Sequence, residues 1–144
     1  MLKKIIVLVL ACFLSFFLDR AFAGAPPSTK LNLPAKYEGK QKVSFGSSVV
    51  LRDITVIIFP DGSGKIITGD YMLPGGRGFF GQEYNCVFQV EGDDLVVIKS
   101  DDEQRLRNLR KFQIVGDEVL ITPSWKMGSR NDYDFESTNL KRTD

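Results

Sequence analysis

The chain has 144 residues, 19 of them Lys or Arg and 18 Asp or Glu, and its formal net charge at pH 7 is +1. Mixed charges that nearly cancel leave no electrostatic footprint for nucleic acid, so we expect no nucleic-acid partner. The sequence contains no histidine, which excludes histidine-assisted serine or cysteine catalysis and nearly all zinc sites.

The N-terminal residues have the pattern of a secretion signal. Two lysines precede a mostly apolar stretch over residues 5–18, and Ala21 and Ala23 supply the small side chains that signal peptidase requires. The apolar stretch is shorter than the ~20 residues that a membrane-spanning helix needs, and no later stretch approaches that length. We therefore predict a signal peptide over residues 1–23, cleaved after Ala23, a periplasmic or secreted protein, and no membrane span after cleavage.

The two cysteines have different expected fates. Cys12 lies in the predicted signal peptide. Its acylation as a lipoprotein is the disfavoured alternative, because cleavage before Cys12 would shorten the apolar region of the signal and leave the apolar residues 13–18 on the processed chain. Cys86 is then the only cysteine of the processed chain, which excludes an intrachain disulfide. It lies in an alternating stretch, 84–90, where a small buried hydrophobe is favoured over a reactive thiol or an intermolecular bridge.

Residues 24–35 contain three prolines and few large apolar side chains, and we predict a flexible leader there. From residue 36 to residue 144 the pattern is that of a single β domain, with short turns between strands. The stretch 101–109 has a helical turn as its alternative, because three consecutive acidic residues suit a helix start. The expected strands are 37–45, 49–59, 65–73, 83–91, 94–100, 104–115, 118–123 and 133–137.

A repeat supports this topology. FQVEGDDLVVIKS at residues 88–100 aligns without a gap with FQIVGDEVLITPS at residues 112–124. Each copy places Gly-Asp between two apolar strands, where a tight hairpin needs residues that tolerate positive φ. The copies are therefore predicted to be consecutive hairpins of one antiparallel meander. Closing that meander into a barrel removes its exposed edges.

Several segments resemble the small lipocalin-like barrels of bacterial secreted proteins. These segments are KYEG at residues 36–39, FPDGSG at residues 59–64, and the Gly-Asp turns at residues 92–93 and 116–117. The resemblance implies an all-β fold, an antiparallel up-and-down meander closed into a roughly eight-stranded barrel that follows the signal peptide.

Two arginines are candidate ligand anchors. Strict alternation from Phe112 turns Arg110 and Asn108 inward, and Arg52 shares a face with the apolar residues of its strand. An arginine inside a barrel is costly unless it is paired, and it is a natural receptor for a ligand carboxylate. The alternatives are a bulge that resets the alternation, or a side chain that snorkels at the rim. Tyr84 joins the candidate site because it occupies the position of Asn108 in the other copy of the repeat.

The glycine-rich stretch 74–81 carries Arg77, Phe79 and Phe80. Exposed aromatic residues beside an arginine are typical of protein interaction hot spots. The alternative is that these aromatic side chains pack against the protein itself, as a lid or plug.

Carboxylates are the remaining chemical groups. Asp132, Asp134 and Glu136 alternate along one predicted strand and could face calcium, although a solvated outer face explains the alternation equally well and is favoured. No phosphate-loop, Gly-x-Ser-x-Gly or Ser-x-x-Lys motif is present. We therefore expect no catalytic residues, no metal and no cofactor.

Together these observations predict a non-enzymatic secreted or periplasmic barrel that binds a small apolar or amphipathic ligand in its interior. The alternative is a protein-binding inhibitor, immunity or assembly factor that acts through the loop over residues 74–84. An enzyme that uses carboxylates in the barrel mouth is the third and least favoured class. The sequence predicts neither the ligand nor the oligomeric state.

Overall fold

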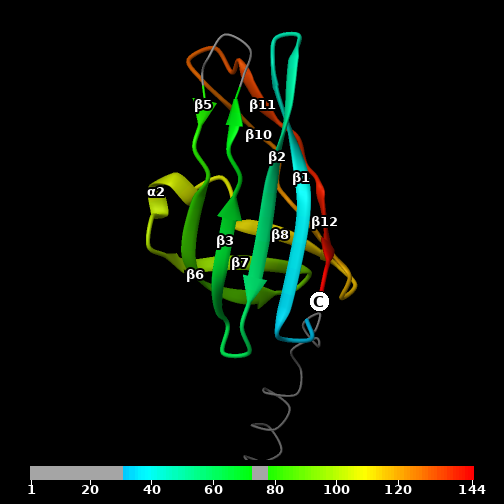
Figure 1. Cartoon of the computed structure of the whole chain (residues 1–144). Helices are drawn as coiled ribbons and strands as arrows, with labels where there is room; N and C mark the ends of the chain where they lie inside the picture. The colour runs from blue at the N-terminus through cyan, green and yellow to red at the C-terminus, as the bar shows by residue number, and fades with distance from the viewer. Residues whose placement is uncertain (1–30, 73–77) are drawn as a thin grey trace, which may run out of the picture.

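The computed structural model describes residues 31–72 and 78–144. The predicted signal peptide, the leader up to residue 30 and Arg77 lie outside the described residues. The elements (Figure 1) are β1 (Ala35–Phe45), β2 (Ser48–Ile58), β3 (Ser63–Thr68), β4 (Tyr71–Met72), β5 (Gly78–Phe79), β6 (Gln82–Glu91), β7 (Asp94–Ser100), α2 (Glu103–Leu106), β8 (Lys111–Val115), β9 (Val119–Ile121), β10 (Trp125–Met127), β11 (Tyr133–Phe135) and β12 (Asn139–Arg142).

Eight strands form a closed antiparallel barrel. Around the ring they run β1, β2, β3, β6, β7, β8, β9 and β12, which is their order along the chain, and β12 pairs with β1 to close it. This confirms the predicted up-and-down meander. Two hairpins, β4–β5 and β10–β11, are inserted between ring strands, and β11 pairs with the far half of β1.

The eighth ring strand is not the predicted one. The predicted strand 133–137 corresponds to β11, which belongs to the inserted hairpin, whereas β12 closes the ring. Strand β12 escaped prediction because Leu140 is its only apolar residue. Leu140 is fully buried, and a Cβ atom on Gly39 would lie 2.8 Å from the Leu140 side chain and 2.7 Å from the Asn139 carbonyl oxygen. Glycine at position 39 is therefore what permits the closing strand to approach so closely.

Two other predicted strands differ from the observed ones, one at its start and one at its end. The predicted strand 104–115 is wrong over its first seven residues, because α2 and a turn occupy them and β8 starts only at Lys111. The alternative of a helical turn is confirmed, with Asp102 as N-cap accepting a hydrogen bond from the Arg105 amide. The predicted strand 65–73 is broken at Gly69, whose N–H donates to the Asp53 carbonyl oxygen, so that the chain continues as the separate β4.

The sequence repeat corresponds to the hairpins β6–β7 and β8–β9, as predicted. Their turns use Gly92 and Gly116 with φ values of 61° and 58°, so both glycines adopt the left-handed conformation that the hairpins need. The hairpins are neighbours in the ring, joined by the pairing of β7 with β8. The sequence repeat therefore reflects two hairpins of the same shape.

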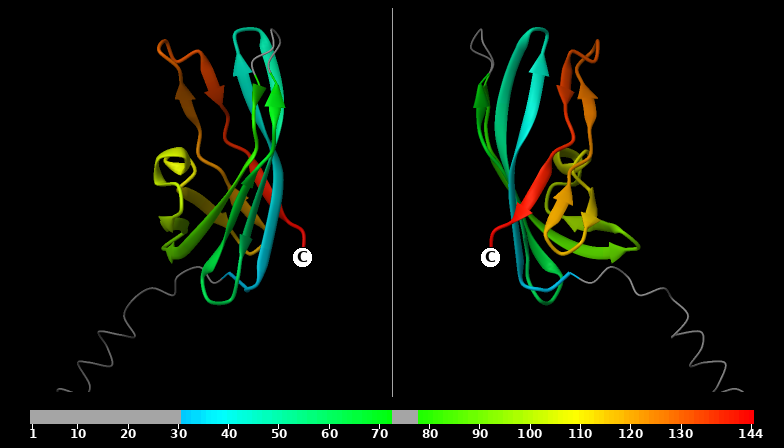
Figure 2. Two further views of the ribbon diagram at one scale, coloured as in Figure 1. Left: turned by 60° about the vertical axis from the view of Figure 1, so that its left-hand side comes forward. Right: turned by 90° about the vertical axis from the view of Figure 1, so that its right-hand side faces the viewer.

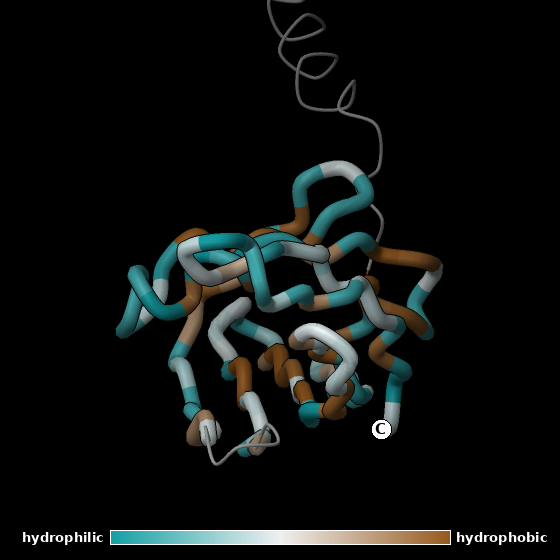
Figure 3. Tube along the Cα trace, turned by 90° about the horizontal axis from the view of Figure 1, so that it is seen from above, coloured by the Kyte–Doolittle hydropathy of each residue, from teal (hydrophilic) through white to brown (hydrophobic). Residues whose placement is uncertain are grey.

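Alternate residues of each strand point inward and fill the barrel over much of its length. Seen from above, hydrophobic and hydrophilic residues are interspersed along the chain (Figure 3). Cys86 belongs to this core, and its burial raises the pKa of the thiol to about 11. The core includes Tyr37, Ile54, Val56, Ile58, Ile66, Phe88, Leu95, Val97, Leu106, Phe112, Ile114, Leu120 and Leu140.

One end of the barrel is closed by a network around Arg142. Its Nη1 donates to Asp117 at 2.7 Å and its Nε donates to Asp144 at 2.8 Å, while its Nη2 donates to the carbonyl oxygens of Asn32 and Pro34. The amide and side chain of Asn32 also donate to the carboxylate of Asp117. The residues just before β1 are thereby tied to the C-terminus, and the first strand begins at Ala35, one residue before the predicted boundary of the domain.

Candidate ligand-binding site

The opposite end of the barrel is open. The strands β4 and β5 and the hairpins β1–β2 and β10–β11 project beyond the ring on this side (Figure 2). Between them and α2 lies a cavity of about 560 Å³. Its lining comprises Arg52, Thr68, Tyr71, Phe79, Phe80, Gln82, Tyr84, Asp102, Gln104, Arg105, Arg107, Asn108, Leu109, Trp125, Met127 and Phe135.

A chain of aromatic rings connects the three projecting hairpins. Contacts of this kind between stacked or edge-on rings stabilise by ~0.5–1.5 kcal/mol each beyond the area they bury. The hairpins therefore form one wall with a fixed shape. The ring-centroid separations are 4.6 Å for Trp125 and Phe135, 6.4 Å for Phe135 and Tyr71, 4.6 Å for Tyr71 and Phe79, 5.8 Å for Phe79 and Tyr133, and 4.7 Å for Tyr133 and Phe45.

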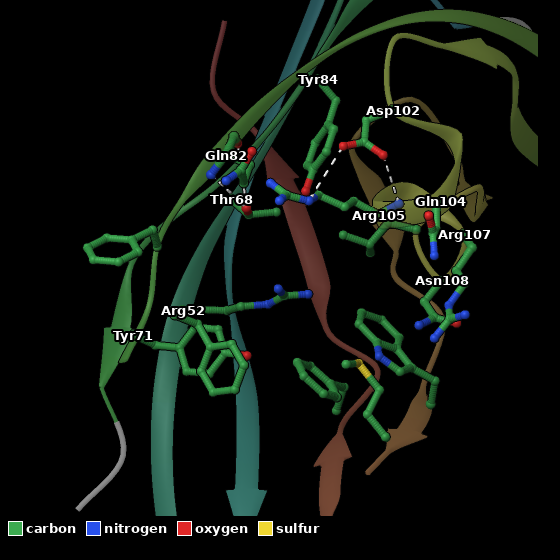
Figure 4. A pocket seen from close by; sticks show the side chains of 16 residues that line it. Arg52, Thr68, Tyr71, Gln82, Tyr84, Asp102, Gln104, Arg105, Arg107 and Asn108 are labelled. Carbon is green, nitrogen blue, oxygen red and sulfur yellow. Dashed lines mark hydrogen bonds and ion pairs between the residues drawn. The ribbon is translucent and has the colours of Figure 1, made fainter. Parts of the chain in front are cut away.

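Arg52 lies at the base of this wall. It extends from β2 into the middle of the cavity (Figure 4), and only 9% of the residue is exposed. Its Nε and Nη2 both donate to Oε1 of Gln41, at 2.9 and 2.8 Å. Gln41 is fully buried and is itself held by its Nε2, which donates to the Glu136 carbonyl oxygen. The guanidinium is therefore placed by a side chain that is fixed in turn.

The charge of Arg52 is stabilised by aromatic rings. Its Cζ lies 5.0 Å from the ring centroid of Phe135, 5.4 Å from that of Trp125 and 5.9 Å from that of Tyr71. Over residues 31–72 and 78–144 it forms no ion pair with a carboxylate. Burial lowers the pKa of the guanidinium, and the nearby hydroxyls of Tyr71 and Tyr84 oppose that shift. Even a lowered arginine pKa leaves the group charged at neutral pH.

Tyr84 and Thr68 extend the wall from the neighbouring strands. Tyr84, on β6, is 7% exposed, and burial raises the pKa of its phenol. Thr68, at the end of β3, accepts a hydrogen bond from the Gln82 amide. These groups bring a polar surface into the cavity beside the aromatic one.

Helix α2 and the turn after it supply the opposite side. Arg105 reaches towards Tyr84 and pairs with Asp102 at 3.6 Å (Figure 4). Gln104, Arg107 and Asn108 complete this side. The cavity is thus lined by three arginines and one aspartate, and its formal charge is positive.

The structure brings most of the predicted site residues together. Arg52, Tyr84 and Asn108 line the cavity, and Phe79 and Phe80 lie at its mouth. Phe79 packs against Tyr71 and Tyr133, whereas Phe80 is 86% exposed.

Arg110 lies elsewhere. It immediately precedes β8, with Nη1 2.6 Å from Glu103 and Nη2 donating to the Val97 carbonyl oxygen, and it does not line the cavity. The interruption by α2 breaks the alternation that had turned it inward. Asn108 does line the cavity, but it reaches it from the turn after α2 and not from a strand, as the alternation had predicted.

Sequence reasoning missed Gln41 and Trp125. Gln41 shares the inward face of β1 with Tyr37 and Val43, so the same alternation that identified Arg52 could have found it. Trp125 is the only tryptophan of the chain, and its strand β10 has three residues, too few to show a periodic pattern. Its Nε1 is the only buried side-chain nitrogen or oxygen without a hydrogen-bond partner in the described part of the chain.

Within the two described ranges, no group of three or more Cys, Asp or Glu side chains is arranged to hold a metal ion. No described helix is long and apolar enough to span a membrane.

The chain was compared with protein-family models, with curated proteins and with solved structures, and none of the three comparisons gives a match.

Proposed function

We propose that the protein is a non-enzymatic binding protein that holds one small amphipathic ligand in the cavity at the open end of the barrel. The single observation that carries the proposal is the cavity itself, about 560 Å³ in volume, with an aromatic wall and a buried guanidinium at its base. Ligand sites are typically ~300–1,000 Å³ and combine apolar walls with a few fixed polar groups. An eight-stranded barrel of lipocalin-like architecture is just wide enough to hold such a ligand.

The distribution of side chains supports this proposal. Large aliphatic and aromatic residues fill the barrel towards its closed end, and at the open end the inward positions are taken by Arg52, Thr68 and Tyr84. A stable core would be served better by apolar side chains at these positions, because buried polar groups cost free energy unless they are fully paired. Contact with a bound ligand would explain why polar side chains occupy these inward positions.

The experiment that tests the proposal uses N-phenyl-1-naphthylamine, a neutral apolar dye whose fluorescence rises in apolar sites. We expect saturable binding to the wild-type protein, accompanied by a change in the emission of Trp125. The variant Asn108→Phe places a large side chain on the cavity wall and should weaken binding at least about tenfold, a loss of ~1.4 kcal/mol. Ile98→Phe adds the same side chain at a position that does not line the cavity and should bind the dye as the wild type does.

Two outcomes would contradict the proposal. Absence of saturable binding to the wild type would remove the ligand site. Equal affinity in Asn108→Phe, with circular dichroism showing a folded protein, would place the dye outside the cavity.

A second candidate function is protein binding through the loop over residues 74–84. The observation that favours it is the exposure of two large apolar residues. Met72, just before the loop, is 69% exposed, and Phe80, within the loop, is 86% exposed. Large exposed apolar side chains that project together are typical of interaction surfaces. Met72→Ser should abolish capture of a protein partner under this second function, and should leave dye affinity within about twofold under the first, because Met72 does not line the cavity.

We also propose that the protein is exported and processed after Ala23, which leaves 144 − 23 = 121 residues. The support is the n-region, apolar stretch and small residues of the N-terminus. The intact mass of the protein recovered from its host tests this directly. A mass that includes residues 1–23, or the mass of a chain that begins at an acylated Cys12, would contradict it.

A further inference from the structure

One edge of the Arg52 guanidinium has no hydrogen-bond partner in the described part of the chain. An arginine side chain has five N–H groups arranged as a rigid fork. The Nε–H and one Nη2–H converge on the single oxygen of Gln41, so Gln41 occupies the edge shared by Nε and Nη2. The second Nη2–H and both Nη1–H groups have no acceptor among the described residues. The edge formed by Nη1 and Nη2 is thus free, and its two parallel N–H groups match the two oxygens of a carboxylate.

No carboxylate of residues 31–72 or 78–144 forms an ion pair with this edge. Among the described residues, Asp102 is the only acidic one that lines the cavity, and its carboxylate is held by the side chain of Arg105 and by the Arg105 amide. The ring faces around Arg52 stabilise a cation but do not neutralise it. A buried charge that has rings and one amide oxygen as its partners remains a strong attractor for an anion.

We propose that the ligand is a carboxylic acid with an apolar or aromatic body, and that its carboxylate binds the free edge of Arg52. This inference rests on the proposed ligand-binding function and specifies its ligand class. The acid group lies innermost, at the base of the cavity, and the apolar body lies along the rings of Tyr71, Phe79 and Trp125 towards the mouth. A planar group with a single negative charge fits one guanidinium edge.

Two matched probes test the inference. Anthracene-9-carboxylate and anthracene-9-carboxamide have the same ring and nearly the same shape, and only the first is charged. We expect the wild-type protein to bind the carboxylate at least about tenfold more tightly, as measured by titration calorimetry near neutral pH. The comparison needs no variant, so it does not depend on the folding of one.

Three variants then assign the preference to Arg52. In Arg52→Met the preference should fall to within about twofold, since the fork is lost. In Arg52→Lys, which keeps the charge but has no fork, it should be intermediate. Lys99→Met removes one positive charge from an exposed position outside the cavity and should keep the full preference.

Each result decides between the claims. Equal affinity of the wild type for both probes would overturn the carboxylate inference and leave the binding function standing. A preference that persists in Arg52→Met would also overturn it. If neither these probes nor the neutral dye bind, the proposed function itself fails.

Discussion

Two arginines mark the two ends of the barrel, and their surroundings differ sharply. Arg142, at the closed end, donates to two carboxylates and two carbonyl oxygens, and its side chain is 13% exposed. Arg52, at the open end, is 9% exposed, shares one amide oxygen and faces aromatic rings. The first arginine ties chain segments together, and the second keeps part of its hydrogen-bonding capacity unused. The half-buried arginine thus serves stability at one end, and the buried one serves, we propose, recognition at the other.

The closed end is also packed more tightly than the open end. Glycine-to-alanine substitutions at the two ends should reveal this with the largest expected difference in the free energy of unfolding. A Cβ atom on Gly64, at the closed end, would lie 1.9 Å from the Ile57 carbonyl oxygen and 2.8 Å from the Phe88 ring, whereas one on Gly78 would have Met72 Cε at 3.8 Å as its nearest neighbour. We expect Gly64→Ala to lower the free energy of unfolding by at least about 3 kcal/mol, because backbone must move to admit the methyl group. Gly78→Ala should change it by less than about 0.5 kcal/mol. Urea denaturation measures both, and equal effects would show that the two halves are packed alike.

The two arginines themselves give the next largest effect. Arg142→Met leaves two carboxylates and two carbonyl oxygens without their donor and should lower the free energy of unfolding by about 2–3 kcal/mol. Arg52→Met leaves only Gln41 without its donors and removes a buried charge, so we expect a loss of about 1 kcal/mol. Dye binding should survive the first substitution at temperatures where the variant is folded.

A surface pair provides the control for these two variants. The side chains of Lys40 and Asp53 form an ion pair at 2.6 Å but are 63% and 68% exposed. Lys40→Met should therefore change stability by less than about 1 kcal/mol. A larger loss in Arg52→Met than in Arg142→Met would contradict the assignment of a structural role to the closed end.

The smallest predicted effect is a dependence on acid. Hydrogen bonds from the Asn32 amide, followed by those of the Asn32 side chain and Arg142, hold the pKa of Asp117 below its usual value. A depressed carboxyl pKa stabilises the folded protein fully above the ordinary value of about 3.9, and that contribution is lost as the pH falls through the lower folded value. Asp117→Asn should therefore flatten the decline of stability below about pH 4, by no more than about 1 kcal/mol because solvent screens the site. An unchanged acid profile would count against the network at the closed end.

The barrel could be predicted from the sequence because the pattern that indicates it recurs along the chain. Alternation over long strands and two Gly-Asp hairpins are properties of many residues at once, so local errors do not change the outcome. Strand β12 was missed because closure depends on a single buried leucine opposite Gly39, a contact between distant parts of the chain. The prediction that β8 begins at residue 104 was wrong because α2 interrupts the alternation there.

The candidate site was predicted in part for the same reason. Arg52 and Tyr84 follow from the alternation of long strands, which the structure preserves. Gln41 holds Arg52 through cross-strand register, and Trp125 reaches the cavity on an inserted hairpin. Contacts of these kinds are set by tertiary structure, and no local pattern in the sequence encodes them.

Native mass spectrometry of the protein purified from its own host tests the central claim most directly, namely that the open end holds a small ligand. We expect the chain with one bound molecule small enough for a cavity of about 560 Å³, released as an acid when the complex is dissociated in the gas phase. The same molecule should be absent from Asn108→Phe purified in parallel. Recovery of the wild-type chain without a small molecule, or with a protein bound in its place, would contradict the account.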